Sequence, residues 1–98
     1  MYKVIIVPRF DAKAVAKKAH LLNMLPTLAV YKKPKDFPDK YVARIFYVGK
    51  ATLKTKVVIT GDTYEMLFSK INSLIDELGL VKISPTPEDD KCLLETWM

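Results

Sequence analysis

The chain has 98 residues, of which 50% are hydrophobic and 28% are charged, and its formal net charge at pH 7 is +5. This length allows one domain with a single modest core, and this composition excludes an intrinsically disordered chain. The longest purely apolar runs, such as residues 4–7, are too short to span a bilayer. We therefore expect a single domain over residues 1–98, with no membrane partner.

The first elements are predicted from local composition. Residues 2–7 are β-branched and aromatic and are followed by Pro8, which predicts a strand. Asp11 is a suitable N-cap, and small or apolar residues then recur at helical spacing as far as Leu22. Asn23 indicates the end of this helix.

The middle of the chain reads as three strands. Residues 26–31 predict a second strand, and the charged segment 32–40 a loop. Residues 41–48 alternate with apolar side chains on both faces, which is typical of a central strand. A turn over 49–54 leads to a strand at 55–60, which we expect to be antiparallel because the connection is short.

A second helix is predicted after these strands. Asp62 and Glu65 form a D-x-x-E variant of the capping box. Apolar residues at spacings of three and four then continue to Leu78, and Gly79 occupies the position expected of a C-terminal glycine. Gly61 allows the sharp turn into the helix.

The last residues are ambiguous in sequence. Residues 80–84 predict a short strand and 85–91 a turn, with one turn of helix at 87–90. Residues 92–98 predict a final strand, although Leu93 and Trp97 also fit a helical i, i+4 contact. The resulting order, β-α-β-β-β-α-β-β, predicts an α+β domain with a mostly antiparallel sheet of five to six strands and both helices on one face.

Side chains typical of enzymes are scarce. His20 is the only histidine, so one chain cannot assemble a multi-histidine metal site. Three glycines leave no phosphate-binding loop. The acidic run 88–90 is more typical of a solvated turn than of a metal site. We expect no catalysis, no metal and no cofactor. Cys92, the only cysteine, cannot form an internal disulfide, and the N-terminus does not resemble a signal peptide, so we expect a cytoplasmic protein.

The charge is distributed unevenly along the chain. Residues 1–60 contain 13 Lys and Arg against 3 Asp, whereas residues 61–98 contain 3 Lys against 8 Asp and Glu. The two parts therefore carry +10 and −5, which add up to the net +5. Such a split produces either one face that attracts anions or two halves that neutralise each other across the fold. The sequence leaves both readings open.

Binding residues are predicted in and around the charged loop. Aromatic rings among cations are typical of single-stranded nucleic-acid surfaces, where rings stack on bases and lysines contact phosphates. A plainer reading is that the prolines stiffen a connection, with the aromatic ring of Phe37 against the sheet and the lysines in solvent. The candidates are Lys32, Lys33, Lys35, Phe37, Lys40, Tyr41 and Arg44, with Tyr31 as a further aromatic.

Arg44 and Glu95 each interrupt an apolar strand. If the two strands are neighbours, these side chains can meet as a cross-strand ion pair, which is more typical of a structural device than of a functional site.

Two stretches carry a resemblance. The block "KPKDFPDKYVARIF" and the ending "PEDDKCLLETWM" resemble short uncharacterised proteins encoded in phages and mobile elements of Gram-positive bacteria. The resemblance covers mainly residues 32–48 and 85–98. It implies a bacterial cytoplasm and an accessory role, and it brings no activity and no site residues.

The sequence as a whole favours a small, basic, non-catalytic binding or regulatory protein that contacts another protein. The alternative is a nucleic-acid-binding protein that uses the basic, aromatic segment 31–47. Exposed strand edges offer a partner a place to add a strand, and a homodimer through such an edge is equally consistent with the sequence.

Overall fold

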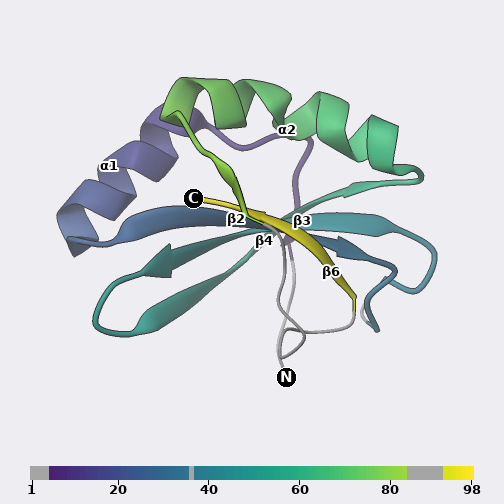
Figure 1. The fold of residues 1–98 in the computed structure, drawn as a ribbon, viewed down its shortest axis with the longest axis horizontal. Helices are drawn as coiled ribbons and strands as arrows, with labels where there is room; N and C mark the ends of the chain where they lie inside the picture. Colours follow the sequence, from purple (N-terminus) through teal and green to yellow (C-terminus); the bar gives the residue numbers. More distant parts are fainter. Residues whose placement is uncertain (1–4, 36, 84–91) are drawn as a thin grey trace.

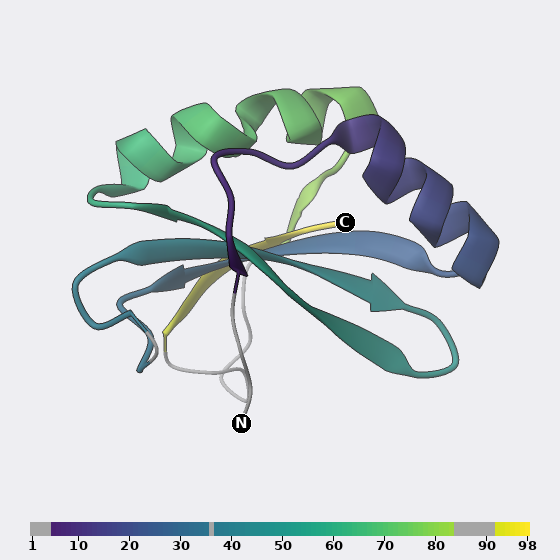
Figure 2. The ribbon, with the colours of Figure 1, turned by 180° about the vertical axis from the view of Figure 1, so that it is seen from behind.

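The computed structural model describes residues 5–35, 37–83 and 92–98. Its elements follow the predicted order β-α-β-β-β-α-β-β. Both helices lie on the same face of one six-stranded sheet (Figures 1 and 2). The elements are β1 (Ile5–Ile6), α1 (Ala12–Leu22), β2 (Leu25–Lys32), β3 (Tyr41–Val48), β4 (Thr52–Gly61), α2 (Tyr64–Leu78), β5 (Lys82–Ile83) and β6 (Leu93–Trp97).

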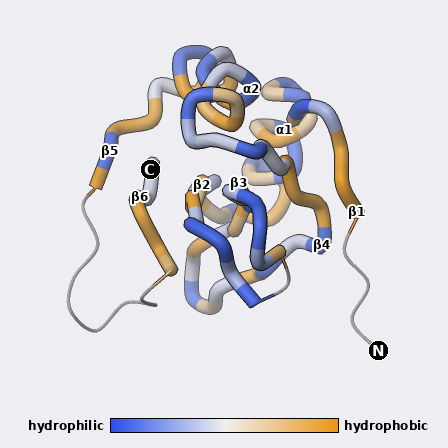
Figure 3. Tube along the Cα trace, turned by 90° about the vertical axis from the view of Figure 1, so that its right-hand side faces the viewer, coloured by the Kyte–Doolittle hydropathy of each residue, from blue (hydrophilic) through white to orange (hydrophobic). Residues whose placement is uncertain are grey.

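The strand order across the sheet is β1-β4-β3-β2-β6-β5. Every pairing is antiparallel except that of β1 with β4. Viewed along the sheet, the helices form a layer above it, with β5 near one edge and β1 at the other (Figure 3). The predicted α+β class is confirmed. Within the described ranges, no helix is both long and apolar enough to cross a bilayer.

The first helix begins and ends at the predicted residues. The side chain of Asp11 accepts hydrogen bonds from the backbone N–H groups of Lys13 and Ala14, so it caps two otherwise unpaired donors. Asn23 adopts a left-handed conformation with φ 55° and donates to the last carbonyls of the helix.

β2 begins one residue earlier than predicted and contains Pro26. Pro26 pairs with β3, whereas the pairing of β2 with β6 begins only at Leu28. The proline thus lies where β2 has a neighbour on one side only, as is usual for proline in a sheet.

The β3–β4 hairpin is antiparallel, as predicted, but β4 begins at Thr52 rather than at residue 55. Its ladder is irregular, because Arg44 pairs with Val58 and Phe46 pairs with Lys54. β4 therefore carries two extra residues opposite Ile45. The hydroxyl of Thr55 donates to the Ile45 carbonyl at 2.7 Å, which satisfies a backbone acceptor inside this bulge.

The core lies between the sheet and the two helices. Alternate residues of β2 and β3 point to this side, together with Ile59 of β4 and the apolar stripes of both helices. The largest fully buried side chains on this side are Leu28, Val30, Ile59, Leu67, Ile71 and Leu74.

The second helix begins differently from the prediction. Its N-cap is Thr63, whose hydroxyl accepts from the Met66 N–H at 3.2 Å, and not Asp62. Asp62 instead forms an ion pair with Lys40, and the hydrogen bond and charge of that lysine lower the pKa of the Asp62 carboxyl. The D-x-x-E capping box is therefore wrong. Two adjacent residues could each serve as a cap, and the tertiary contact with Lys40 decides between them.

Glycine is required at position 61 because the junction of β4 and α2 has no room for a side chain. A Cβ added there would lie 2.7 Å from the backbone nitrogen of Leu67, which is closer than packed atoms allow. At the other end of the helix, Gly79 has φ 64°, as the predicted C-terminal glycine requires.

The final strand resolves the ambiguity of the C-terminal sequence in favour of β-structure. β6 pairs with β2 on one side and with β5 on the other. β5 is shorter than predicted, and Val81 and Met98 extend its contact with β6 by two backbone hydrogen bonds. The predicted helical turn at 87–90 and residues 2–4 of the predicted first strand lie outside the described residues.

The strands of Arg44 and Glu95 are not neighbours, so the condition for a cross-strand ion pair between these residues is not met. β2 lies between their strands, and Glu95 pairs with Val30 whereas Arg44 pairs with Ala29. Val30 and Ala29 are consecutive and point to opposite faces, so the two charged side chains also lie on opposite faces.

The buried carboxylate of Glu95 is held instead by two neutral donors. The Tyr64 hydroxyl donates to Oε1 at 2.7 Å, and the Trp97 indole N–H donates to Oε2. Aromatic contacts extend this cluster, since the Tyr64 ring stacks on Phe68 at 5.9 Å between centroids and Phe68 contacts Trp97 at 6.2 Å. A polar cluster therefore fastens β6 to α2.

The reassigned cap can be tested with two alanine variants. We expect Thr63→Ala to lower the free energy of unfolding by about 1 kcal/mol, because the Met66 N–H loses its acceptor. Asp62→Ala should have a smaller effect, since it removes only an exposed ion pair. Urea denaturation followed by Trp97 fluorescence measures both, and a larger loss for Asp62→Ala would restore the capping box.

The Tyr64–Glu95 contact predicts a dependence on alkaline pH. Burial and the hydrogen bond to Glu95 raise the pKa of Tyr64 to about 12 from 10.0. A raised folded-state pKa means that this stabilisation is complete below pH 10.0 and is lost as the pH rises towards about 12. We expect Tyr64→Phe to cost about 2 kcal/mol at neutral pH. The difference between wild type and variant should shrink over that alkaline window, and an unchanging difference would contradict the assigned contact.

Candidate binding cleft

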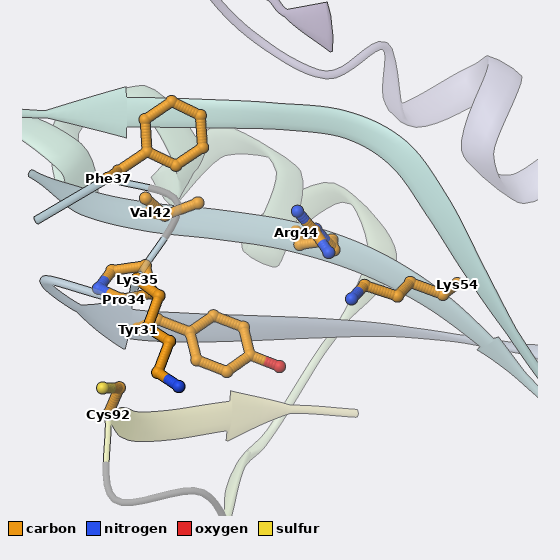
Figure 4. Close-up of a pocket in the computed structure, with 8 residues that line it drawn as sticks. All are labelled: Tyr31, Pro34, Lys35, Phe37, Val42, Arg44, Lys54 and Cys92. Atoms are coloured by element: carbon orange, nitrogen blue, oxygen red, sulfur yellow. The ribbon is translucent and has the colours of Figure 1, made fainter. Parts of the chain in front are cut away.

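A cleft of about 370 Å³ lies on the side of the sheet away from the helices, which we call the far face. Its walls come from the end of β2, the following loop, β3, β4 and the residue before β6 (Figure 4). The lining residues are Tyr31, Pro34, Lys35, Phe37, Val42, Arg44, Lys54 and Cys92.

Strand alternation selects the cleft residues of β2 and β3. Tyr31 and Val42 are directly paired across the two strands, and Arg44 follows two residues later on the same face. The intervening Ala43 points into the core under the helices. The far face is itself closely packed near the cleft, because Val42 is 2% exposed and Arg44 6%.

The bulge in β4 brings Lys54 into the cleft. In a regular ladder Lys56 would stand opposite Phe46, two residues beyond the Arg44–Val58 pair. The two extra residues of the bulge place Lys54 at that position instead. Lys54 therefore lies on the same face as Arg44, and both line the cleft.

The loop between β2 and β3 is held by backbone turns. The Phe37 N–H donates to the Pro34 carbonyl at 2.9 Å, and the Lys40 N–H donates to the Phe37 carbonyl at 3.1 Å. Lys33 closes the loop with an N–H bond to the Lys40 carbonyl and has a left-handed φ of 47°. These turns hold the Phe37 ring and the Lys35 side chain at one wall of the cleft.

The lining is positively charged. Lys35, Arg44 and Lys54 contribute three cations, and no carboxylate belongs to the lining among residues 5–35, 37–83 and 92–98. The aromatic rings of Tyr31 and Phe37 supply apolar surface, together with Pro34 and Val42. The cleft can therefore take a ligand that combines a flat apolar group with negative charge.

The structure brings together three of the seven predicted binding residues, namely Lys35, Phe37 and Arg44. Tyr31, the further aromatic candidate, joins them. Lys32 and Lys33 are exposed beside the cleft rather than in it, and the Lys32 N–H bonds the Cys92 carbonyl at 2.7 Å.

Lys40 and Tyr41 do not line the cleft. The Lys40 ammonium pairs with Asp62 at the junction of β4 and α2. Tyr41 points towards the helices, because it has the same parity as Ala43, and its ring meets Tyr64 edge-on at 6.4 Å. Residues of a loop between two strands can face either side of the sheet. The sequence pattern alone does not show which loop residues face which side.

Sequence reasoning missed Lys54, Pro34, Val42 and Cys92 as lining residues. Lys54 was assigned to a turn, although the alternation of Lys54, Lys56 and Val58 is a strand signal that could have placed it on one face with Arg44. The position of Cys92 at the cleft depends on the pairing of β6 with β2, which links residues far apart in sequence.

The part of the chain that the structure describes contains no group of three or more His, Cys, Asp or Glu side chains able to hold a metal ion. Comparison of the chain with protein-family models, with curated proteins and with solved structures finds no match. The cleft is therefore interpreted from its own chemistry.

Proposed function

We propose that this chain is a small, non-catalytic protein that binds single-stranded nucleic acid in the far-face cleft. The observation that supports this proposal is the combination of two aromatic rings with three cations in one cleft. Unpaired bases stack on aromatic side chains, and lysine and arginine contact the phosphates beside them.

The size of the cleft suits a base better than a folded surface. Its volume of about 370 Å³ lies near the lower end of the range of about 300–1,000 Å³ typical of small-ligand pockets. In this proposal one unpaired base lies in the cleft against the rings of Tyr31 and Phe37. Lys35 at the loop and Lys54 at the hairpin then bind the phosphates that precede and follow it.

A duplex fits this arrangement less well. Its bases are stacked inside the helix and cannot reach aromatic rings in a cleft without being flipped out, which costs a few kcal/mol. The proposal therefore includes a preference for single strands over duplexes of the same length. In keeping with the phage and mobile-element resemblance, we place this binding in the cytoplasm of a bacterial cell, in an accessory role.

Contact with another protein is the second candidate function. It is favoured by the exposed apolar side chains at both edges of the sheet, including Ile5 and Ile6 on β1 and Ile83 on β5. The described edge strands are only two residues long, so an added strand would gain few backbone hydrogen bonds from them. The same limit applies to a homodimer through an edge.

Charge reversal tests the cleft directly. We expect the double variant Lys35→Glu, Lys54→Glu to weaken binding of a labelled single-stranded oligonucleotide at least tenfold in fluorescence anisotropy, because two phosphate contacts become repulsive. Wild-type binding should weaken as salt rises, with a slope in log–log form of about −0.7 per phosphate contact.

The matched control is Lys13→Glu, Lys82→Glu, which changes the net charge equally at two exposed lysines outside the cleft. We expect this control to bind within about threefold of wild type. An equal loss in both double variants would mean that a basic protein attracts nucleic acid without using the cleft. No binding by wild type at low salt would refute the proposed function.

The aromatic part of the proposal is tested by Phe37→Ala. Removing a stacking ring costs about 1–3 kcal/mol, so we expect a loss of affinity of about fivefold or more with an unchanged salt slope. Met66→Ala on α2 is a control that truncates an exposed apolar side chain outside the cleft. A salt slope that changes with Phe37→Ala, or an unchanged affinity, would contradict stacking on this ring.

A further inference from the structure

Three leucines are exposed at one end of the molecule. Leu21, Leu22 and Leu25 are 74%, 39% and 64% exposed, and we call this group the leucine end. The sequence predicted that Leu22 belongs to the apolar stripe of its helix, yet the structure leaves it largely outside the core. Exposing a leucine side chain to water is unfavourable, so a cluster of three exposed leucines indicates an interaction surface.

The leucine end lies where the C-terminal end of α1 meets the tip of the β3–β4 hairpin, and Leu25 also lines a hollow of about 400 Å³ between them. The C-terminal end of α1 and the tip of the β3–β4 hairpin lie on the same side of the molecule (Figures 1 and 2). They are in contact, because a Cβ at Gly49 would lie 3.0 Å from the Met24 side chain. Leu53, on the strand after the tip, is 39% exposed and adds apolar surface.

Lysines flank these leucines. Lys17 and Lys18 stand four residues before Leu21 and Leu22, so each pair shares one side of the helix. The Lys18 ammonium lies 5.2 Å from the centre of the Tyr47 ring, which holds it above the sheet. Lys50 at the hairpin tip is also exposed.

The carboxylates that the structure describes lie elsewhere. Asp39, Asp62 and Glu65 are at the opposite end of β3 and β4. Asp11 and Glu77 line one hollow beside the first turn of α1, and Asp76 precedes Glu77 in the last turns of α2. Glu95 is buried against Tyr64 of α2. The leucine end is therefore apolar and cationic, with no neighbouring described carboxylate to offset its charge.

We propose that the leucine end docks on the surface of an anionic lipid bilayer. The exposed leucines enter the boundary between headgroups and acyl chains, while the flanking lysines contact the negative headgroups. A bilayer accepts exposed apolar side chains without needing a surface of complementary shape. This proposal departs from the sequence-based expectation of no membrane partner, since the exposure of these leucines depends on the fold. It concerns peripheral contact and not a membrane span.

A second copy of the chain suits this surface poorly. A two-fold contact would place the lysines of one leucine end against those of the other, because the same patch faces itself. Like charges would then be desolvated together, and no described carboxylate at this end is available to pair with them. Charge complementarity thus favours an anionic occupant over self-association.

Vesicle co-sedimentation tests the proposal. We expect wild type to bind vesicles of equal parts phosphatidylcholine and phosphatidylglycerol, and not vesicles of phosphatidylcholine alone. Leu21→Gln, Leu25→Thr should reduce binding at least tenfold, because both apolar anchors are lost. Lys17→Gln and Lys50→Gln should each reduce it about fivefold at low ionic strength.

Matched controls lie far from the leucine end. Met66→Gln removes an apolar side chain that is 47% exposed on α2, and Lys82→Gln removes a lysine on β5; both should bind like wild type. Circular dichroism checks that each variant keeps its fold. The cleft variants Lys35→Glu, Lys54→Glu report on nucleic acid separately, with Lys54 the nearer of the two to the leucine end.

Three results would overturn the proposal. One is the absence of binding to anionic vesicles at low ionic strength. Another is binding that survives Leu21→Gln, Leu25→Thr, which would indicate adhesion of a basic protein by charge alone. The third is a wild-type dimer in analytical ultracentrifugation that becomes monomeric with the leucine variant, which would show that a second copy covers this surface.

Discussion

Both helices cover the same face of the sheet, and this constraint decides the role of each strand residue. In β3, Ala43 and Ile45 must be small or apolar because they face the helices, whereas Val42 and Arg44 are directed to the far face. Alternate strand residues on the helix side form the core, and the residues between them are left on the far face, where they can bind a ligand. The cleft follows from this division, since its β2 and β3 residues all belong to the far-face set.

The elements that could be predicted from sequence are those with local signals. α1, β3 and the body of α2 were predicted closely, because caps, alternation and helical spacing are local signals. The cap of α2 was misassigned because Asp62 is engaged by Lys40, which lies more than twenty residues earlier. Only part of the candidate site could be predicted, because some of its residues are brought in by contacts between distant parts of the chain. Lys35 and Phe37 follow from composition, whereas the contribution of Lys54 depends on a bulge that the sequence does not reveal.

The uneven distribution of charge along the sequence corresponds to two basic surfaces among the described residues. The cations of the first part gather both at the far-face cleft and at the leucine end. Several acidic side chains are taken up by structure instead, with Asp11 capping α1, Asp62 paired to Lys40 and Glu95 buried beneath α2. Among the residues that the structure describes, cations therefore predominate at these two surfaces.

The position of β6 has a consequence for folding. β6 pairs with β2 even though Val30 and Glu95 are more than sixty residues apart. During synthesis, β2 and β3 can pair as soon as they leave the ribosome, but the other edge of β2 must wait for residues 93–97. Closing so long a loop is slow, and until then a nascent chain exposes an apolar strand edge. The docking of β6 beneath α2 is therefore expected to come late in folding.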